Sequence, residues 1–430
     1  MEISIPLRVW GDGASVNKRW SLLAVTVASL FCTLGASLDS RLFVFGVPDK
    51  RYLNLDPLWF VFGWSLSILA NGVMPSHDHL GRCFPEGSHR ARSAGRRVAG
   101  IWRMFLADSS ADLEHYVKTY AFETFHNTCD CCFQCFATKR PTRLNAYNFS
   151  LDAPWTFYSR SHAQYMLNTG CGVAAAWAMP GWHLTICRYD LMHSMMLGTL
   201  PILMGGAFFY LLGRNYFNGP STGPWQLRFT YQLTVAFAQY KTWLRLHRLM
   251  PSERPFTIHR LSLSSAKSDP PVWKGKAGNN LTLAKWLLHL FPTLSRDFPD
   301  DWNELICCCF WGNITYVDIL KASPLVLTDA HRARIETPRL AALGGHAALC
   351  RKAIEAGSQS FRTIPNHHVM DHIFRDDINP SHAWCFADED FVGRMTNICH
   401  TLREPNKLMR KYLLRLLLVI QTKKSRQPKL

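Results

Sequence analysis

The chain has 430 residues, of which 48% are hydrophobic and 18% charged, which excludes a disordered tail and allows one large core or two domains. Lys and Arg number 48 against 31 Asp and Glu, so the formal net charge of +17 favours a polyanionic partner such as DNA. A basic but otherwise ordinary protein, or one that sits on an anionic membrane, would have the same charge. The chain has fourteen cysteines, and several of them are adjacent in sequence, which is unfavourable for disulfide bonds. The first residues do not form a secretory signal. We therefore expect a reducing compartment, nuclear or cytoplasmic.

The first two hundred residues predict strands interrupted by helices. Apolar runs predict strands at Ile3–Trp10, Ser21–Thr33, Arg41–Val47, Gly100–Ala107 and Trp182–Arg188. Gly11-Asp12-Gly13 is expected to end the first strand in a turn. An amphipathic helix is expected from Asp56 to Asn71, with Pro57 at an early helical position, and a further helix begins at Ala111 or Asp112.

From His193 onward the pattern changes to helical periodicity. Helices are expected within Trp225–Leu249, Leu281–Phe291 and Arg339–Ala356. The sequence therefore predicts an α/β fold in which a mixed sheet is followed by a large all-helical insertion.

The segment 195–212 is apolar enough to suggest a membrane span. Pro201, Gly205 and Gly206 interrupt it, so a buried core helix is the preferred interpretation. A membrane protein using this segment is kept as an alternative.

Two aspartates follow predicted strands, which is a good position for metal-binding carboxylates. Asp12 follows the first strand and Asp112 follows the fourth. A strand end fixes the position of a side chain while the loop leaves it open to substrate. If the two strands are neighbours, both carboxylates could bind one metal ion, and a third would complete a two-metal site. Taken alone, each residue has a structural interpretation, Asp12 as part of a turn and Asp112 as a helix cap.

Four motifs, in this order, resemble the RNase H-like DDE transposases, especially the Kyakuja-Dileera-Zisupton group and its CACTA, Mutator and hAT relatives. They are the strand IPLRVWGDG, the segment LADSSADLEHYVKTYAF followed by a cysteine pair, Asp190-Leu191-Met192-His193 after HLTICRY, and PNHHVMDH followed by NPSHAWCFADEDFVGR. The resemblance extends from residue 3 to about residue 415. The sequence departs from the family pattern at Asn366, where a Lys is expected, and in its abrupt N-terminus, which suggests a fragment or an incomplete gene model.

The resemblance implies three catalytic acids and four supporting residues. Asp12, Asp112 and Glu389 would hold two Mg²⁺ or Mn²⁺ ions, with Asp108 as the rival of Asp112. The supporting residues would be Asp190, His193, His368 and His372. The alternative for Asp190 and His193 is a helix cap and a partly buried histidine.

The resemblance also implies a domain organisation. The first part of an RNase H-like core would span residues 1–193, with a Cys-rich loop at 126–136. A helical insertion would follow at 194–360, the C-terminal helical part of the core at 361–419, and a basic tail at 420–430.

The Cys-rich loop contains Cys132-x-x-Cys135, which has zinc-ligand spacing. Tetrahedral Zn²⁺ needs two further ligands, for which the candidates are Cys129, His126, His162 and His183. The alternative is that the thiols are reduced and bind nothing. The adjacent cysteines 307–309 are expected in a helix core.

Three basic segments are candidates for contacts with DNA phosphates. They are a loop with Arg90, Arg92, Arg96 and Arg97, a helical face with Lys241, Arg245 and Arg248, and a tail with Lys423, Lys424, Arg426 and Lys429. On the helix, Trp243, Leu246 and Met250 are expected to point to the core. A solvated basic face is the alternative in each case.

Together these features predict a transposon-derived enzyme that cleaves and transfers DNA strands, with DNA as partner, a homo-oligomer as a further possibility and no small-molecule substrate. The first alternative is a catalytically inactive, transposase-derived DNA-binding protein.

Overall fold

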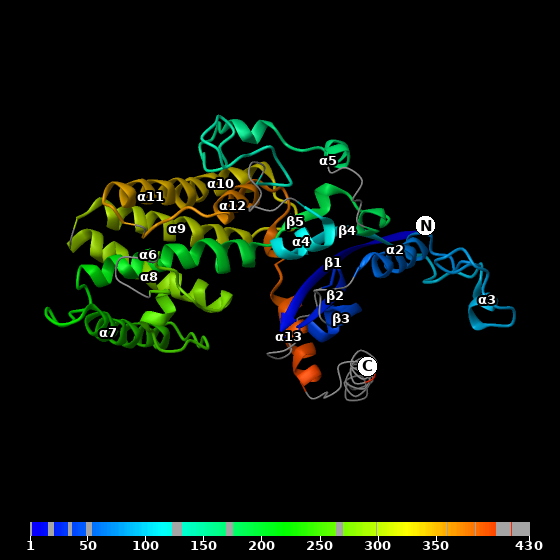
Figure 1. Cartoon of the computed structure of the whole chain (residues 1–430), viewed down its shortest axis with the longest axis horizontal. Helices are drawn as coiled ribbons and strands as arrows, with labels where there is room; N and C mark the ends of the chain where they lie inside the picture. Colours follow the sequence, from blue (N-terminus) through cyan, green and yellow to red (C-terminus); the bar gives the residue numbers. More distant parts are fainter. Residues whose placement is uncertain are drawn as a thin grey trace. The chain divides into compact units, whose positions relative to one another are not determined.

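A computed structural model of the chain describes residues 2–15, 21–32, 37–48, 54–122, 131–168, 175–263, 270–297, 299–358, 360–382, 384–400 and 414. The chain divides into two compact units, each formed by separate stretches of sequence. Unit 1 comprises Met1–Thr124, Arg160–Asp190 and Trp384–Leu430, and unit 2 comprises Phe125–Ser159 and Leu191–Ala383. The strands all belong to unit 1, and unit 2 is mostly helical within the described residues (Figure 1).

Unit 1 is built on a five-stranded mixed sheet. Its strands are β1 (Ile3–Ser15), β2 (Ser21–Ser29), β3 (Leu42–Pro48), β4 (Trp102–Ala111) and β5 (Cys187–Tyr189). They lie in the order β3-β2-β1-β4-β5, with β2 antiparallel to both of its neighbours and β1, β4 and β5 parallel. The expected mixed α/β architecture is thereby confirmed.

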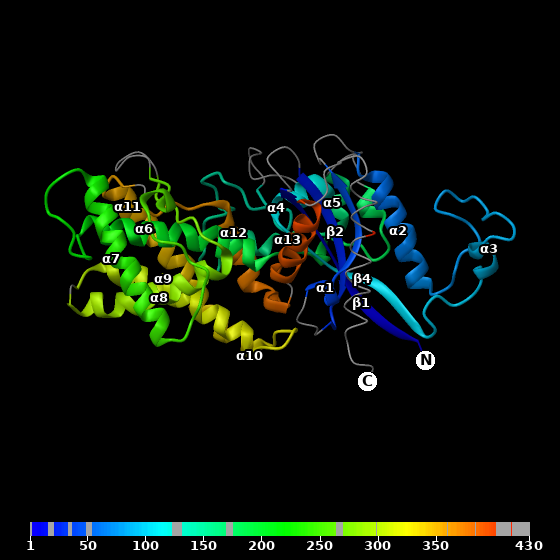
Figure 2. The same ribbon diagram turned by 90° about the horizontal axis from the view of Figure 1, so that it is seen from below.

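Helices cover both faces of this sheet. The helices of unit 1 are α1 (Ser37–Ser40), α2 (Asp56–Asn71), α3 (His89–Ser93), α4 (Leu113–Tyr120), α5 (His162–Asn168) and α13 (Phe386–His400). Successive side chains of a strand point to opposite faces. Trp10 of β1 donates a hydrogen bond to the sulfur of Cys385 at the start of α13, whereas its neighbour Gly11 lies under the imidazole of His115 in α4. Helices α13 and α4 therefore cover opposite faces of the sheet. Figure 2 shows α13 on one side of the sheet and α2 on the other.

The structure corrects the predicted end of the first strand. β1 continues through Gly11-Asp12-Gly13 to Ser15, because β2 pairs with it throughout and Asp12 lies opposite Ala24. Asp12 is therefore a strand residue and not part of a turn.

Unit 2 is a bundle of helices. They are α6 (Leu200–Gly213), α7 (Trp225–Leu246), α8 (Ala277–Asp297), α9 (Asp301–Lys321), α10 (Asp329–Arg339), α11 (Gly345–Glu355) and α12 (Pro365–Arg375). The boundaries of the unit differ from the domain limits expected from the sequence. Among the described residues, 131–159 and 361–382 group with unit 2, whereas the sequence had suggested that they belong to the α/β core.

The apolar segment near 195–212 forms a helix from Met192 to Gly213 that is long and apolar enough to cross a membrane. In the structure 83% of its most apolar stretch is buried. Gly205 and Gly206 lie against Pro271 and Phe361 so closely that a side chain would not fit. This burial is typical of a core helix, as the sequence analysis preferred.

Two histidines are buried in unit 2 with their rings stacked. The centroids of His346 and His367 lie 4.1 Å apart, and His346 Nε2 is 3.1 Å from the carbonyl oxygen of Arg362. Burial lowers the pKa of His346 to about 4, and burial together with His346 holds the pKa of His367 well below its usual value. Both imidazoles are therefore neutral in the folded protein at pH 7.

Acidification is expected to destabilise unit 2 through this pair. Below about pH 6.5 His346 binds a proton in the unfolded chain but not in the folded chain. The free energy of unfolding therefore decreases as the pH falls from about 6.5 to about 4. A pKa difference of this size corresponds to about 3 kcal/mol. Urea unfolding of the wild-type protein and of His346→Gln should give free energies whose pH dependences diverge over this interval. Parallel curves would contradict the prediction.

Candidate functional site

Four side chains of unit 2 form a group that could hold a metal ion. The sulfurs of Cys132 and Cys135 and the ring nitrogens of His368 and His372 all lie within 4.8 Å of one another. Cys132 Sγ lies 3.3 Å from His372 Nε2, Cys135 Sγ lies 3.3 Å from His368 Nε2, and the two Nε2 atoms are 3.2 Å apart. Two thiolates and two imidazoles converging on one point are a donor set for tetrahedral coordination.

Local structure explains why each pair of ligands points the same way. The cysteines lie in a tight loop in which the backbone N–H groups of Gln134 and Ala137 donate to the sulfurs of Cys132 and Cys135. His368 and His372 are four residues apart on α12, which places them one turn apart on the same face of the helix. We call these four residues the Cys/His group.

The surroundings orient the imidazole of His368 for binding. Its Nδ1 is 3.0 Å from the carbonyl oxygen of Ala146, so Nδ1 carries the proton and Nε2 presents its lone pair to the Cys/His group. The buried indole of Trp155 packs against both imidazoles, with centroid distances of 4.5 Å to His368 and 5.1 Å to His372. Ring orientation is thereby fixed by a hydrogen bond and by packing.

Charge within the group favours a thiolate. Burial alone would raise the pKa of Cys132, but the hydrogen bond with Cys135 and the nearby His372 lower it well below its usual value. Burial opposes the charged form of His372, yet the Cys132 thiolate raises its pKa. The hydrogen bond with Cys132, followed by burial, raises the pKa of Cys135. Cys132 is therefore the sulfur of the group that becomes a thiolate most readily, and the thiolate is the form in which a cysteine binds metal.

The Cys/His group ties a loop to α12, and a buried ion pair supports the same junction. Arg339 is fully buried, forms an ion pair of 2.7 Å with Asp371 of α12, and donates to the carbonyl oxygen of Phe149 in the loop. Arg375 of α12 donates to the carbonyl oxygen of Ser150. These contacts explain why the loop packs with the helices of unit 2.

This group contains two histidines that the sequence analysis had not expected beside the cysteines. His368 and His372, expected to support the catalytic carboxylates, lie instead with Cys132 and Cys135. Of the four expected partners of the cysteines, His162 and His183 stack on each other in unit 1, with centroids 4.2 Å apart, and Cys129 and His126 lie outside the described residues. The spacing of His368 and His372 on a helix that begins at Pro365 was the signal that could have identified them.

The two expected catalytic aspartates lie at the same edge of the sheet in unit 1. β1 and β4 are parallel neighbours, and the last pair in their register is Trp10 opposite Ser110. Asp12 and Asp112 each lie two residues beyond this pair, Asp12 still within β1 and Asp112 directly after the end of β4. Because side chains alternate along a strand, the side chain of Asp12 points to the same face of the sheet as that of Trp10, which is the face covered by α13.

Glu389 is carried on the first turn of α13, which is fixed over β1 and β2. Besides the contact between Trp10 and Cys385, Thr26 of β2 donates to Asp388 at 3.4 Å. The buried Asp388 also forms an ion pair of 2.5 Å with Arg41. Asp12, Asp112 and Glu389 are each half-buried. Their carboxylate oxygens do not all lie within 4.8 Å of one another, so among the described residues these three acids do not form a group that could hold one metal ion.

Asp108 and Asp112 occupy different environments. Asp108 lies within β4, is 3% exposed, and faces the guanidinium groups of Arg8 and Arg188 at 3.9 and 3.5 Å. Asp112 is half-buried after the strand and caps α4, its carboxylate accepting the His115 N–H at 2.7 Å. The accessible position at the strand end favours Asp112 over Asp108 as a metal ligand.

No known protein-family model matches this chain. No curated protein is similar to it in sequence. What the chain does is therefore inferred from its own residues, and the transposase family suggested by the motifs is a proposal.

The remaining expected site residues are distributed over both units. Asp190 follows β5 in unit 1, is buried, and accepts the backbone N–H of Cys385 at 3.0 Å, whereas His193 is a half-buried residue of unit 2. The expected arginines of unit 1 are all exposed in and beside α3: Arg90, Arg92, Arg96 and Arg97. The basic tail at 423–429 lies outside the described residues.

Helix α7 presents its basic residues to solvent, but its expected apolar face is only partly buried. Lys241, Arg245 and Arg248 are exposed and Trp243 is buried, as expected. Leu246 is 77% and Met250 97% exposed, contrary to expectation, because α7 ends at Leu246 and the helical period no longer applies beyond it. On α9, Cys309 is buried and Cys308 is exposed, so the run 307–309 is only in part a helix core.

Proposed function

We propose that this chain is a transposon-derived DNA transposase of the RNase H-like DDE type, which cleaves and transfers DNA strands by metal-dependent phosphoryl transfer. The observation that carries the proposal is that Asp12, in the last part of β1, and Asp112, directly after β4, each lie two residues beyond the same paired position of two adjacent parallel strands. A mixed sheet followed after β5 by a helical unit, and then by α13, agrees with an RNase H-like core that contains a helical insertion.

The donor set fits the ions that such chemistry needs. Mg²⁺ and Mn²⁺ prefer carboxylate oxygens as ligands. Asp12, Asp112 and Glu389 are half-buried, so their side chains are partly accessible to solvent. When bound, two ions activate a water or a 3′-hydroxyl and stabilise the leaving oxygen of the phosphodiester. Asp12, Asp112 and Glu389 would hold these ions.

Residues around Glu389 give the third acid a defined position. Asp388, its neighbour, is held by Arg41 at 2.5 Å and by Arg8 at 3.8 Å. Arg8 also faces Asp108, so one buried ion network joins β1, β4 and α13. This network would keep Glu389 near the sheet.

The exposed arginines of unit 1 would hold the DNA. Arg90, Arg92, Arg96 and Arg97 lie within a short stretch, and such cations neutralise phosphates without reading sequence. The exposed basic residues of α7 in unit 2 would act in the same way. DNA binding should accordingly weaken steeply with added salt.

We further propose that the ion in the Cys/His group is Zn²⁺ with a structural role. Four protein ligands leave no open coordination position for a substrate, which is typical of structural zinc sites. The ion would fix the loop 131–159 to α12.

A plasmid-nicking assay tests the proposed activity. The wild-type protein is expected to nick supercoiled DNA with Mg²⁺ or Mn²⁺ and not with EDTA. Asp12→Asn should lose nicking but retain DNA binding in a gel-shift assay, because the amide keeps the side-chain shape and removes the charge that binds metal. Asp152 is exposed, and the variant Asp152→Asn, prepared in parallel, serves as the matched control. Equal nicking by all three proteins would refute the proposal, and DNA binding without nicking would favour the inactive alternative.

A further inference from the structure

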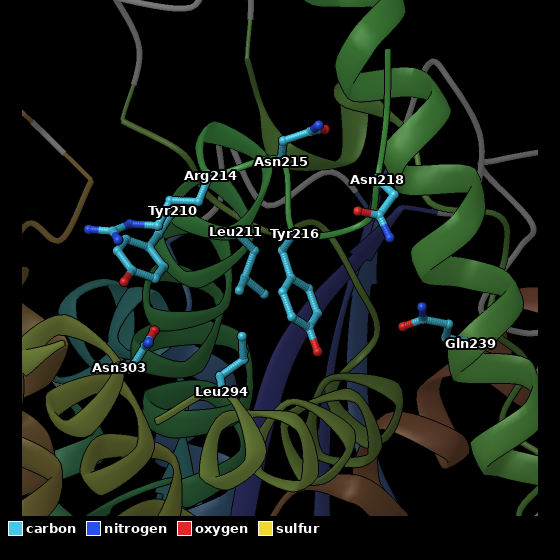
Figure 3. A pocket seen from close by; sticks show the side chains of 9 residues that line it. All are labelled: Tyr210, Leu211, Arg214, Asn215, Tyr216, Asn218, Gln239, Leu294 and Asn303. Atoms are coloured by element: carbon cyan, nitrogen blue, oxygen red, sulfur yellow. The ribbon is translucent and has the colours of Figure 1, made fainter. Parts of the chain in front are cut away.

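Unit 2 contains a polar cavity to which no role has yet been assigned. It has a volume of about 680 Å³, within the range of small-molecule sites. Its lining comes from α6, the loop that follows it, and helices α7, α8 and α9: Tyr210, Leu211, Arg214, Asn215, Tyr216, Asn218, Gln239, Leu294 and Asn303. In Figure 3, Asn218 and Gln239 approach from one side, Tyr210 and Arg214 lie on the other, and Tyr216 stands between them.

Three polar groups of the lining are available to a ligand. The hydroxyl of Tyr216 and the amides of Asn218 and Gln239 make no hydrogen bond to another residue in the described part of the chain. Each of them can both donate and accept a hydrogen bond. Asn218 is held in the left-handed region at φ 51°, so the loop presents its amide in a conformation that few other residues adopt readily. Leu211 and Leu294 are part of the lining but are almost fully buried.

The charges around the cavity are already balanced. Arg214 stacks on the ring of Tyr210 and forms an ion pair of 2.6 Å with Asp300. Tyr210 also donates to Asp300 at 3.1 Å. Burial and the nearby Asp297 raise the pKa of Tyr216, so a second acid lies close to this side of the cavity. A phosphate would therefore find no uncompensated cation here, and a neutral ligand fits better.

We propose that this cavity binds a nucleobase. The edge of adenine carries a hydrogen-bond donor beside an acceptor. The side-chain amide of Asn or Gln, which also carries one donor and one acceptor, can form a pair of hydrogen bonds with this edge. The ring itself would lie beside the half-buried ring of Tyr216. A sugar is the weaker candidate, because Tyr210 is already covered by Arg214 and stacked on Trp302, with centroids 6.0 Å apart. The base could belong to a free nucleoside or to an unpaired position of a strand. The inference uses residues of unit 2 alone and does not depend on strand cleavage.

Calorimetric titration of the full chain with adenosine, AMP and ATP tests the inference. Adenosine should bind at least as tightly as ATP, because the phosphates gain nothing. Gln239→Ala and Asn218→Asp should each weaken adenosine binding at least fivefold. Gln226→Ala removes an exposed glutamine on the same helix that does not line the cavity, and should leave binding unchanged.

A second arm distinguishes the two sources of the base. A single-stranded oligonucleotide carrying one 2-aminopurine is titrated against the same variants. Binding of adenosine that depends on Gln239 identifies a free nucleoside as a ligand, and dependence seen only with the oligonucleotide identifies an unpaired base. The inference is overturned if neither probe responds to Gln239→Ala and Asn218→Asp, or if glucose binds with the same dependence and adenosine does not.

Discussion

Asp112→Asn is expected to abolish metal-dependent strand cleavage while leaving the fold intact. In the structure the Asp112 carboxylate caps α4 by accepting the N–H of His115. Asparagine caps a helix as well as aspartate does, so the free energy of unfolding should change by no more than about 0.5 kcal/mol. The amide carries no charge for a divalent ion, and cleavage should fall by on the order of 10³-fold, as when other groups that stabilise transition-state charge are removed.

Asp112→Ala is the matched comparison, because it removes both the cap and the charge. It should lose cleavage to the same extent and in addition cost about 1 kcal/mol of stability. Titration with Mn²⁺ should show weaker binding in both variants. Full activity in Asp112→Asn would mean that Asp112 acts only as a cap. Asp108→Asn should differ from both, because it removes one of the two carboxylates that face the buried Arg8, leaving only Asp388, and so destabilises unit 1.

Loss of metal from the Cys/His group is expected to destabilise unit 2. We expect the purified protein to contain one Zn²⁺ per chain at this group, and Cys132→Ser or His372→Gln to abolish it. An ion that binds only the folded state, at a free concentration a thousand times its dissociation constant, stabilises by about 4 kcal/mol. Metal content by mass spectrometry and thermal unfolding with and without a chelator measure both effects.

A cysteine outside the group provides the control. Cys308 is exposed on α9, so Cys308→Ser should keep the metal and the unfolding temperature of the wild type. Substitution by Co²⁺ should give the visible absorption of a tetrahedral thiolate site, and Cys132→Ser should lose it. Wild-type protein that contains no zinc and unfolds at the same temperature with chelator present would rule out the proposed structural ion.

The elements that could be predicted from the sequence are those with a local signal. Short apolar runs predicted the places of β1 to β4, and Asp56-Pro57 marked the start of α2. The end of β1 was missed, because Gly11-Asp12-Gly13 favours a turn locally, whereas the pairing of Asp12 with Ala24 across to β2 keeps it extended. Leu246 and Met250 followed the helical period but lie where the helix stops, so periodicity alone misassigned them.

The sequence by itself determined that this chain is basic, that its strands precede a long helical region, and that Asp112 follows one of those strands. Only the tertiary structure decided which residues meet. Cys132 and His368 are separated by more than two hundred residues, and no local pattern records that a loop and a helix so far apart in sequence will pack together. The shared edge of Asp12 and Asp112 likewise depends on the parallel pairing of β1 with β4, and the nucleobase cavity is formed where four helices of unit 2 leave space between them. Such contacts arise from the packing of complete elements, which the residues of each element specify only jointly.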